Sequence, residues 1–290
     1  MISRKALGLT AWLRFSLARF FLFPRINFLS SEGVFRPCID LHEGKVKQIV
    51  GGTLSNDAAA LRTNFVSAQT AAWYAELYRR DGLRGGHVIR LGPGNDAAAL
   101  AALAAYPGGL QIGGGIHAEN AGAFLAAGAS HVIVTSWVFR AGRLDFDRLN
   151  ALVRAIGRKR LVLDLSCRVR DGQYWVVTDR WQKFTGLTVN RENLEHLAAY
   201  CDEFLIHAVD VEGLCGGVDL KLVEMLDRWS PIPTTYAGGA RSLADLEAVT
   251  RVGRGRIDLT IGSALDIFGG SGVRYADAVA FNQRHATSAP

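Results

Sequence analysis

The sequence predicts an α/β fold: a single (β/α)8 TIM barrel built from two duplicated half-barrels. After residue 34, short apolar runs alternate eight times with amphipathic stretches, as expected for parallel strands buried on both faces. The chain has 290 residues, and one such barrel takes roughly 250. The third observation is that motifs of the first half recur in the second.

The recurrence has a nearly constant interval. The repeated residues are Asp40 and Asp164 (124 residues apart), Gly114 and Gly238 (124 apart), and Ser136 and Ser263 (127 apart). Each half would carry one carboxylate at a strand end and one glycine-rich turn. This pattern indicates an internal duplication.

The first half of the body contains four predicted strand–helix units. The strands are expected at 35–41, 87–91, 110–113 and 131–135, and the helices at 69–80, 96–105, 118–127 and 144–156. A long polar segment, 42–68, separates the first strand from the first helix. We expect it to be a loop above the barrel.

The second half repeats this rhythm. The strands are expected at 161–165, 204–207, 235–237 and 257–261, and the helices at 191–200, 220–229, 242–250 and 273–283. An insert at 166–190 contains Asp171-Gly172, a hairpin turn signal. An open, doubly wound sheet is the alternative architecture, but the duplication favours closure. No linker divides the body, so we predict one domain from 34 to 290.

Residues 1–33 form a predicted N-terminal extension. Residues 1–31 contain five Lys or Arg and no acid, which is typical of an organelle transit peptide. The apolar stretch 20–23 is too short to cross a membrane. We therefore expect a plastid or mitochondrial protein. The alternatives are a disordered extension, or one created by an early start codon, on a cytoplasmic protein.

The rest of the chain is almost neutral. Of the net charge of +6, the extension contributes +5, so the body carries about +1 and no basic stripe. This argues against nucleic acid and membranes as partners. The four cysteines show no metal-ligand spacing, which argues against zinc and favours reduced thiols. No exposed apolar stripe is evident, and we expect a monomer.

Asp40 and Asp164 end the first and fifth predicted strands, which lie opposite each other in an eight-stranded ring. Reactive groups in such barrels sit at the carboxyl ends of the strands. Two carboxylates facing across the mouth suit a general base and a general acid acting on one substrate. The structural alternative is that each caps the loop after it, but the duplication favours catalysis.

The glycine-rich turns predict two anion sites. Glycine lets the backbone approach an anion closely, and the helix that follows adds the positive end of its dipole. One site would combine Gly114 and Gly115 with Thr135 and Ser136, and the other Gly238 and Gly239 with Gly262 and Ser263. We expect a small-molecule substrate with a phosphate at each end. The alternative is a pair of tight loops.

Five other side chains could serve the same mouth. His207 ends the sixth strand, although a hydrogen-bonded core histidine is an equal alternative. Trp181 or Trp175 of the insert could stack on a heterocycle, with Trp181 preferred, or form an apolar lid. His42 and Lys45, in the first loop, could be solvated or could help to hold an anion.

Several segments resemble the phosphoribosylformimino-aminoimidazole carboxamide ribotide isomerases of histidine biosynthesis, and most of all their eukaryotic branch. The resemblance covers about 34–270. The matching segments are CIDLHEGKVKQIVGGT (38–53), GGGI (113–116), VTSW (134–137), LDLSCR (163–168), HAVDVEGLCGG (207–217), YAGGAR (236–241) and DLTIGSALDIFGG (258–270).

The resemblance implies a barrel made by half-barrel duplication and an Amadori rearrangement. The bisphosphorylated aminoaldose ProFAR becomes the aminoketose PRFAR. Asp40 would be the general base at C2′ and Asp164 the general acid. No cofactor or metal is implied, because the protonated imine of the substrate accepts the electrons. Gly52, Arg168 and Gly213 lie in matching segments and are expected to contact substrate.

Five positions depart from the bacterial pattern of this family. Bacterial members usually carry Arg at the position of Gln48, Asp at that of Arg90, and Thr at that of His207. They also have Asp-Gly-Thr where this chain has Glu212-Gly213-Leu214. The roles of these side chains are left open by the resemblance.

Two other functions compete with the isomerase. The imidazole glycerol phosphate synthase cyclase shares the half-barrel repeat and is expected to carry a lysine in the first loop, where Lys45 and Lys47 stand. A requirement for ammonia would identify it. A catalytically silent phosphate binder would be favoured by loss of either aspartate, and both are present.

Overall fold

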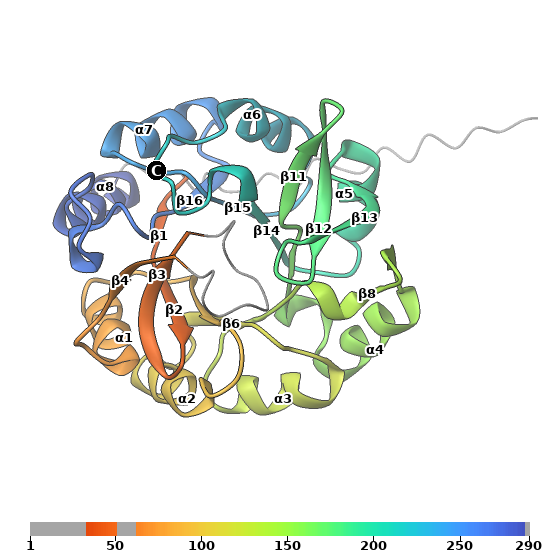
Figure 1. The fold of residues 1–290 in the computed structure, drawn as a ribbon, viewed down its shortest axis with the longest axis horizontal. Coiled ribbons are helices and arrows are strands. Elements are labelled where there is room, and N and C mark those ends of the chain that lie inside the picture. The colour runs from red at the N-terminus through yellow and green to blue at the C-terminus, as the bar shows by residue number, and fades with distance from the viewer. Residues whose placement is uncertain (1–32, 51–61, 288–290) are drawn as a thin grey trace, which may run out of the picture.

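The computed structural model describes residues 33–50 and 62–287. Parallel strands form a central ring, and helices surround it (Figure 1). This confirms the predicted α/β barrel. The ring strands are β1 (Phe35–Arg36), β2 (Cys38–His42), β5 (Gly86–Arg90), β6 (Leu110–Gly113), β7 (Val132–Val134), β10 (Leu161–Asp164), β14 (Glu203–His207), β15 (Thr234–Ala237) and β16 (Ile257–Thr260).

The ring closes because one stretch of chain serves both ends of the sheet. In hydrogen-bonding order, β1 begins the sheet next to β16, and β2 follows β5 near the other end. Only Pro37 separates β1 from β2, where a single strand was predicted. Proline has no N–H to donate, so the ladder is interrupted there. The Pro37 carbonyl still accepts from the His87 amide at 3.0 Å.

The helices pack around the outside of the ring. They are α1 (Ala71–Arg80), α2 (Asp96–Ala105), α3 (Ala118–Ala126), α4 (Phe146–Ile156), α5 (Arg191–Leu197), α6 (Leu220–Trp229), α7 (Leu243–Val252) and α8 (Tyr275–Thr287). All eight were predicted within a few residues. In the described part of the chain, no helix has the length and apolar character needed to cross a membrane.

Side-chain caps determine where several helices begin. Thr70, Asp145, Asn190 and Asp219 each accept a hydrogen bond from a backbone N–H in the first turn of α1, α4, α5 and α6. A cap of this kind contributes about 1 kcal/mol. These helices therefore start at defined residues after their loops.

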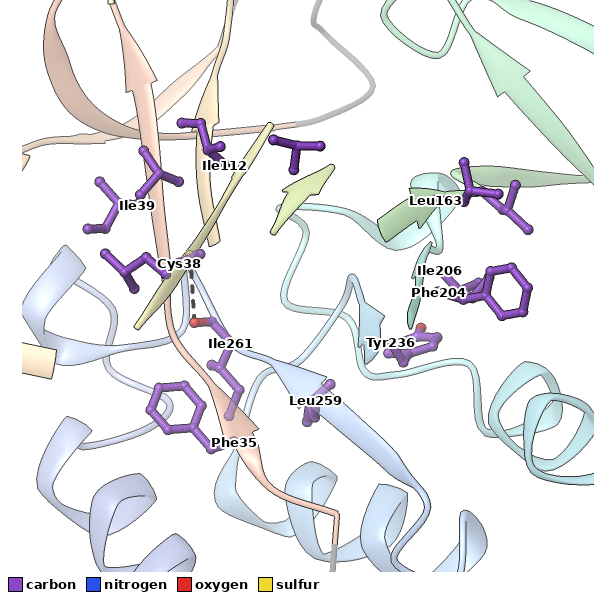
Figure 2. Close-up of a cluster of buried hydrophobic side chains, with 14 of the residues drawn as sticks. Phe35, Cys38, Ile39, Ile112, Leu163, Phe204, Ile206, Tyr236, Leu259 and Ile261 are labelled. Carbon is purple, nitrogen blue, oxygen red and sulfur yellow. Dashed lines mark hydrogen bonds between the residues drawn. The ribbon is translucent and has the colours of Figure 1, made fainter. Parts of the chain in front are cut away.

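The main apolar core lies between the ring and the helices. Alternate strand residues point outward into it, because side chains in a strand alternate between its faces. Figure 2 shows part of this core, including Phe35, Ile112 and Phe204, which are at most 1% exposed. Tyr78 of α1 reaches back to the ring and donates its hydroxyl hydrogen bond to the Cys38 carbonyl at 2.9 Å.

The inside of the barrel begins with a buried polar floor near the start of the strands. Glu203 accepts hydrogen bonds from Gln111 Nε2 at 2.8 Å and Thr235 Oγ1 at 2.7 Å. Arg36 pairs with Asp258 at 2.6 Å and lies 3.9 Å from Glu203. Every member of this polar floor therefore has a partner, which burial of polar groups requires.

An apolar layer lies above the polar floor and supports the mouth. Its side chains are Ile133, Val162, Leu205 and Ala237, with Ile89 packed against them. Because residues two apart on a strand share a face, the next inward positions are Asp164 on β10 and His207 on β14. Above the apolar layer, the inward positions thus present ionisable side chains at the carboxyl ends of the strands.

Additional strands flank the ring strands (Figure 1). The segment 42–68 was predicted to be a loop, but its described residues form β3 (Lys45–Ile49) and β4 (Thr63–Val66). Ladder pairing of β2 with β3 and of β3 with β4 overrides the polar composition of this segment. A small hairpin, β8 (Phe139–Arg140) and β9 (Arg143–Leu144), was not predicted either.

The insert forms a three-stranded antiparallel sheet, which we call the insert sheet. Its strands are β11 (Cys167–Arg170), β12 (Gln173–Thr178) and β13 (Lys183–Thr188). Asp171 and Gly172 form the turn between β11 and β12 with φ of 53° and 74°, so the predicted hairpin is confirmed. These positive angles fit an Asp-Gly hairpin turn.

Replacing Glu203 by Ala is expected to lower the free energy of unfolding by about 3–5 kcal/mol, because Gln111, Thr235 and Arg36 lose a buried partner. Urea denaturation measures this. Glu247→Ala, at an exposed position of α7, is the control and should change stability by less than about 0.5 kcal/mol. Equal stability of both variants would contradict a structural role for the polar floor.

Candidate active site

A pocket opens at the carboxyl ends of the barrel strands. It brings together nine of the predicted site residues from both halves of the chain: Asp40, Asp164, Trp181, His207, Gly213, Gly238, Gly239, Gly262 and Ser263. It extends down toward the apolar layer at Leu205 and Ala237. The pocket therefore lies over the centre of the barrel.

Asp40 comes from β2 and lines one side of the pocket. Gln48 of β3 donates from Nε2 to Asp40 Oδ2 at 3.1 Å. Burial raises the pKa of Asp40, as does the nearby Glu212, while His207 and Gln48 lower it; the result is about 6. A carboxyl group with this pKa is ionised at neutral pH and is a stronger base than an ordinary aspartate.

Asp164 comes from β10, on the opposite side of the ring. It accepts hydrogen bonds from Thr135 Oγ1 at 2.9 Å and Ser166 Oγ at 2.7 Å. Burial raises the pKa of Asp164, and His207 and these two hydroxyl groups oppose the rise. Both oxygens are thus held in place, so the orientation of the carboxyl group is defined.

His207 lies between elements of the pocket. Its Nε2 is 3.1 Å from Glu212 Oε2, and its ring centroid is 5.3 Å from that of Trp181. Burial by itself would lower the pKa of His207, but Glu212, Asp164 and Asp40 raise it to about 9. The imidazole is therefore charged at neutral pH.

The glycine cluster of the second half lies in the pocket. Gly238 and Gly239 have φ of 117° and 76°, which an L side chain rarely adopts. A Cβ on Gly239 would stand 2.2 Å from the Gly217 carbonyl oxygen. Close by, Ser263 Oγ donates to Gln48 Oε1 at 3.2 Å. This side of the mouth therefore presents a glycine turn and a hydroxyl group together.

The glycine cluster of the first half does not line this pocket. Gly114 and Gly115 turn with φ of 87° and 67°. Arg90 Nη2 donates to the Gly114 carbonyl at 2.5 Å, and Asn120 Nδ2 to the Gly115 carbonyl at 2.9 Å. Arg90 also pairs with Asp96. Side chains from β5 and α3 thus hold the conformation of this turn.

The hydroxyl groups paired with that cluster already have partners. Thr135 donates to Asp164, and Ser136 Oγ accepts the backbone N–H of Asp179 at 3.1 Å. Asp179 lies in the turn between β12 and β13, where Asp179, Arg180 and Trp181 all have positive φ. The turn at the tip of the insert sheet therefore contacts Ser136, two residues beyond β7, and Trp181 of the same turn lines the pocket.

The other predicted contacts lie farther out. Arg168 Nε pairs with Asp210 at 2.7 Å, outside the pocket. Trp175 donates from its indole nitrogen to the Arg170 carbonyl at 3.2 Å, within the insert sheet. His42 Nδ1 lies 3.0 Å from Lys47 Nζ. Gly52 lies outside the described residues.

Sequence reasoning did not assign Gln48 or Glu212 to the site. Gln48 contacts Asp40 because β3 folds back beside β2, and no motif reveals that hairpin. Glu212 approaches His207 through the short turn after β14. The only sequence signal for either residue was its departure from the bacterial pattern. Cys38 and Thr260 also line the pocket floor.

This arrangement suits proton transfer. Two carboxyl groups with raised pKa values face one pocket from opposite strands, and each is oriented by hydrogen bonds. A substrate bound between them could lose a proton to one and gain a proton from the other. The described residues contain no group of three or more His, Cys, Asp or Glu arranged to hold a metal ion.

Comparisons with known proteins identify the relatives of this chain. The family model described as "Histidine biosynthesis protein" matches residues 35–271. A 1-(5-phosphoribosyl)-5-((5-phosphoribosylamino)methylideneamino)imidazole-4-carboxamide isomerase of Medicago truncatula, named chloroplastic, is 54% identical over 260 residues, 88% of this chain and 83% of the relative.

Fungal isomerases of the same name are equally similar. The Yarrowia lipolytica protein is 52% identical over 258 residues, and the Neurospora crassa protein 53% over 253; each match covers 86% of this chain and 98% of the relative. With these relatives and a family match over most of its length, the chain belongs to the ProFAR isomerase family of histidine biosynthesis.

Proposed function

We propose that this protein converts ProFAR to PRFAR by an Amadori rearrangement, with Asp40 as general base and Asp164 as general acid. The observation that carries the assignment is the pair of oriented carboxyl groups facing one pocket. The substrate class follows from the family to which the chain belongs.

The reaction needs one proton donor and one proton acceptor. Asp164, in its protonated form, gives a proton to the ribose ring oxygen as the bond from C1′ to that oxygen breaks, leaving a protonated imine. Asp40 then takes the proton from C2′. The electrons of the C2′–H bond form C1′=C2′, and the imine nitrogen accepts the displaced pair. The enaminol tautomerises to the aminoketose.

The two carboxyl groups suit these opposite tasks. Asp40 has a pKa of about 6, so most of it is ionised at neutral pH and ready to accept a proton. The raised pKa of Asp164 makes a protonated form accessible. Substrate phosphates bound nearby would raise both values further, because like charges disfavour ionisation.

The remaining predicted residues are proposed to bind the substrate. One phosphate would meet the amides of Gly238, Gly239 and Gly262 and the hydroxyl of Ser263. The other would bind at Gly114 and Gly115 with Thr135 and Ser136, where the Asp179 amide now contacts Ser136. Trp181, His207, Gly213, Arg168 and Gly52 would surround the rest of the substrate.

Asp40→Asn and Asp164→Asn should each lower turnover at least about a hundredfold, because a general acid or base contributes about 10²–10⁴. A coupled cyclase assay with purified protein measures this. Asp202→Asn, just before β14 at the other end of the barrel and partly exposed, is the control. Near-normal turnover of either active-site variant would remove that residue from the chemistry.

Melting curves of Asp40→Asn separate catalysis from folding. The folded-state pKa of about 6 exceeds the ordinary 3.8, so ionised Asp40 opposes folding above pH 6, and this penalty disappears as the pH falls toward 4. At pH 8 the variant should therefore melt a few degrees above the wild type. A melting temperature below that of the wild type would instead indicate that the variant loses turnover because its folded state is destabilised.

The two phosphate groups of the substrate provide a second test of the proposed function. Inorganic phosphate should compete with ProFAR, and an analogue lacking one phosphate should bind poorly. Ser263→Ala should raise KM by roughly 10–100-fold, the loss expected for a hydrogen bond to a charged group. Ser130→Ala, at the other end of the barrel, should leave KM unchanged. Equal binding of a monophosphate would contradict the two-phosphate site.

The N-terminal extension concerns the location of the protein in the cell. We propose that residues 1–33 precede the barrel domain and direct it to an organelle, as their composition and the chloroplastic relative support. A fusion of residues 1–33 to a fluorescent protein should enter plastids or mitochondria in plant protoplasts. The same fusion with its five Lys and Arg replaced by Ser should stay in the cytosol. Cytosolic fluorescence of the unaltered fusion would contradict the proposal.

A further inference from the structure

The pocket gathers three carboxyl groups around one imidazole. Asp40 on β2, Asp164 on β10 and Glu212 after β14 all interact electrostatically with His207. Among the described residues that line the pocket, there is no lysine or arginine. The other histidine of the lining is His87 on β5. Three carboxyl groups in one pocket therefore face few candidates for a counter-ion.

His87 does not supply that positive charge. It is 4% exposed on the inward face of β5, and burial together with His207 and Arg36 lowers its pKa to about 3. The thiols of Cys38 and Cys215 also face the pocket, and burial raises the pKa of each, so both stay neutral at neutral pH. His207 is then the cation among these lining groups.

Strand register and two neighbouring side chains hold His207 in place. Leu205 on β14 pairs with Asp164 on β10, so His207, two residues farther along, rises above the same inward face. Glu212 holds its Nε2 at 3.1 Å, and Trp181 packs against the ring. Both partners of the pair are shielded, with side chains 14% and 24% exposed. Such shielding strengthens charge interactions.

We propose that His207, held by Glu212, is the internal counter-ion of the active site, a positioning residue that keeps the Asp40 carboxylate ionised beside Asp164 and Glu212. The neighbouring carboxyl groups raise the pKa of His207 to about 9, and His207 lowers the pKa of both aspartates. The proposal rests on the proposed function only in the test that measures enzymatic activity.

The two members of the pair have opposite expected effects. Without the imidazolium, ionised Asp40 loses a favourable neighbour, so its pKa rises. Without the Glu212 charge, ionised Asp40 loses an unfavourable neighbour, so its pKa falls. A merely structural pair would not move the ionisation of Asp40 in opposite directions.

The pH profile of kcat/KM is the first test. Below pH 6, wild-type kcat/KM should fall as Asp40 takes up a proton. His207→Asn should move this acidic limb up by roughly one pH unit, so that much of the lost activity returns at pH 8–9. Glu212→Gln should move it down. His131→Asn, which removes the histidine of a partly exposed pair with Asp202, should leave the profile unchanged.

The second test reads the charge of His207 directly. In protein labelled with ¹⁵N histidine, the signals absent from His207→Asn belong to His207. At pH 7 both ring nitrogens should carry protons, and this state should persist to about pH 9 in the wild type but not in Glu212→Gln. This readout does not depend on which aspartate is the base.

The outcomes are distinguishable. A neutral His207 at pH 7 overturns the counter-ion proposal. So does a folded His207→Asn protein whose kcat/KM profile keeps the acidic limb of the wild type. Full turnover of Asp40→Asn overturns the general base, while the NMR titration still reports on His207. If His207→Asn does not fold, His207→Gln supplies the assignment of the His207 signals, and Glu212→Gln and the titration of the wild type then decide the matter.

Discussion

Closure of the barrel at Pro37 is the constraint on which the rest of the structure depends. Because β1 and β2 are one stretch of chain, the sheet meets itself, and all ring strands run in the same direction. Parallel strands bring their carboxyl ends to one mouth. Asp40 and Asp164, which 124 residues separate in the chain, therefore face one pocket. No local contact could bring them together.

Along the barrel axis, residues that stabilise the fold lie near the start of the strands, and the carboxyl groups proposed to act on substrate lie at the mouth. The polar floor around Glu203 has its hydrogen bonds satisfied, and the apolar layer above it closes the bottom of the pocket. At the mouth, by contrast, burial of the Asp40 and Asp164 carboxyl groups is unfavourable, and their pKa values are raised. Ionised, they oppose folding while they make proton transfer accessible. The large outer core around the ring offsets that cost.

Much of the fold could be predicted because its signals are local. Apolar periodicity located the helices, and Asp171-Gly172 identified the hairpin of the insert sheet. The strands β3 and β4 were missed because they lie in a predominantly polar segment and are ordered by ladder pairing, β3 with β2 and β4 with β3. For the same reason Gln48 was not assigned to the site, although it donates a hydrogen bond to Asp40.

By itself, the sequence determined the barrel, its duplication, the two aspartates and the glycine turns, because periodicity, spacing and backbone freedom are written in the chain. Only the tertiary structure decided which side chains surround those aspartates. Glu212 pairs with His207, and the insert sheet places the Asp179 amide on Ser136. These contacts join segments whose approach depends on closure of the ring and packing of the loops, so they and the pKa values that they set have no signature in any short stretch of sequence.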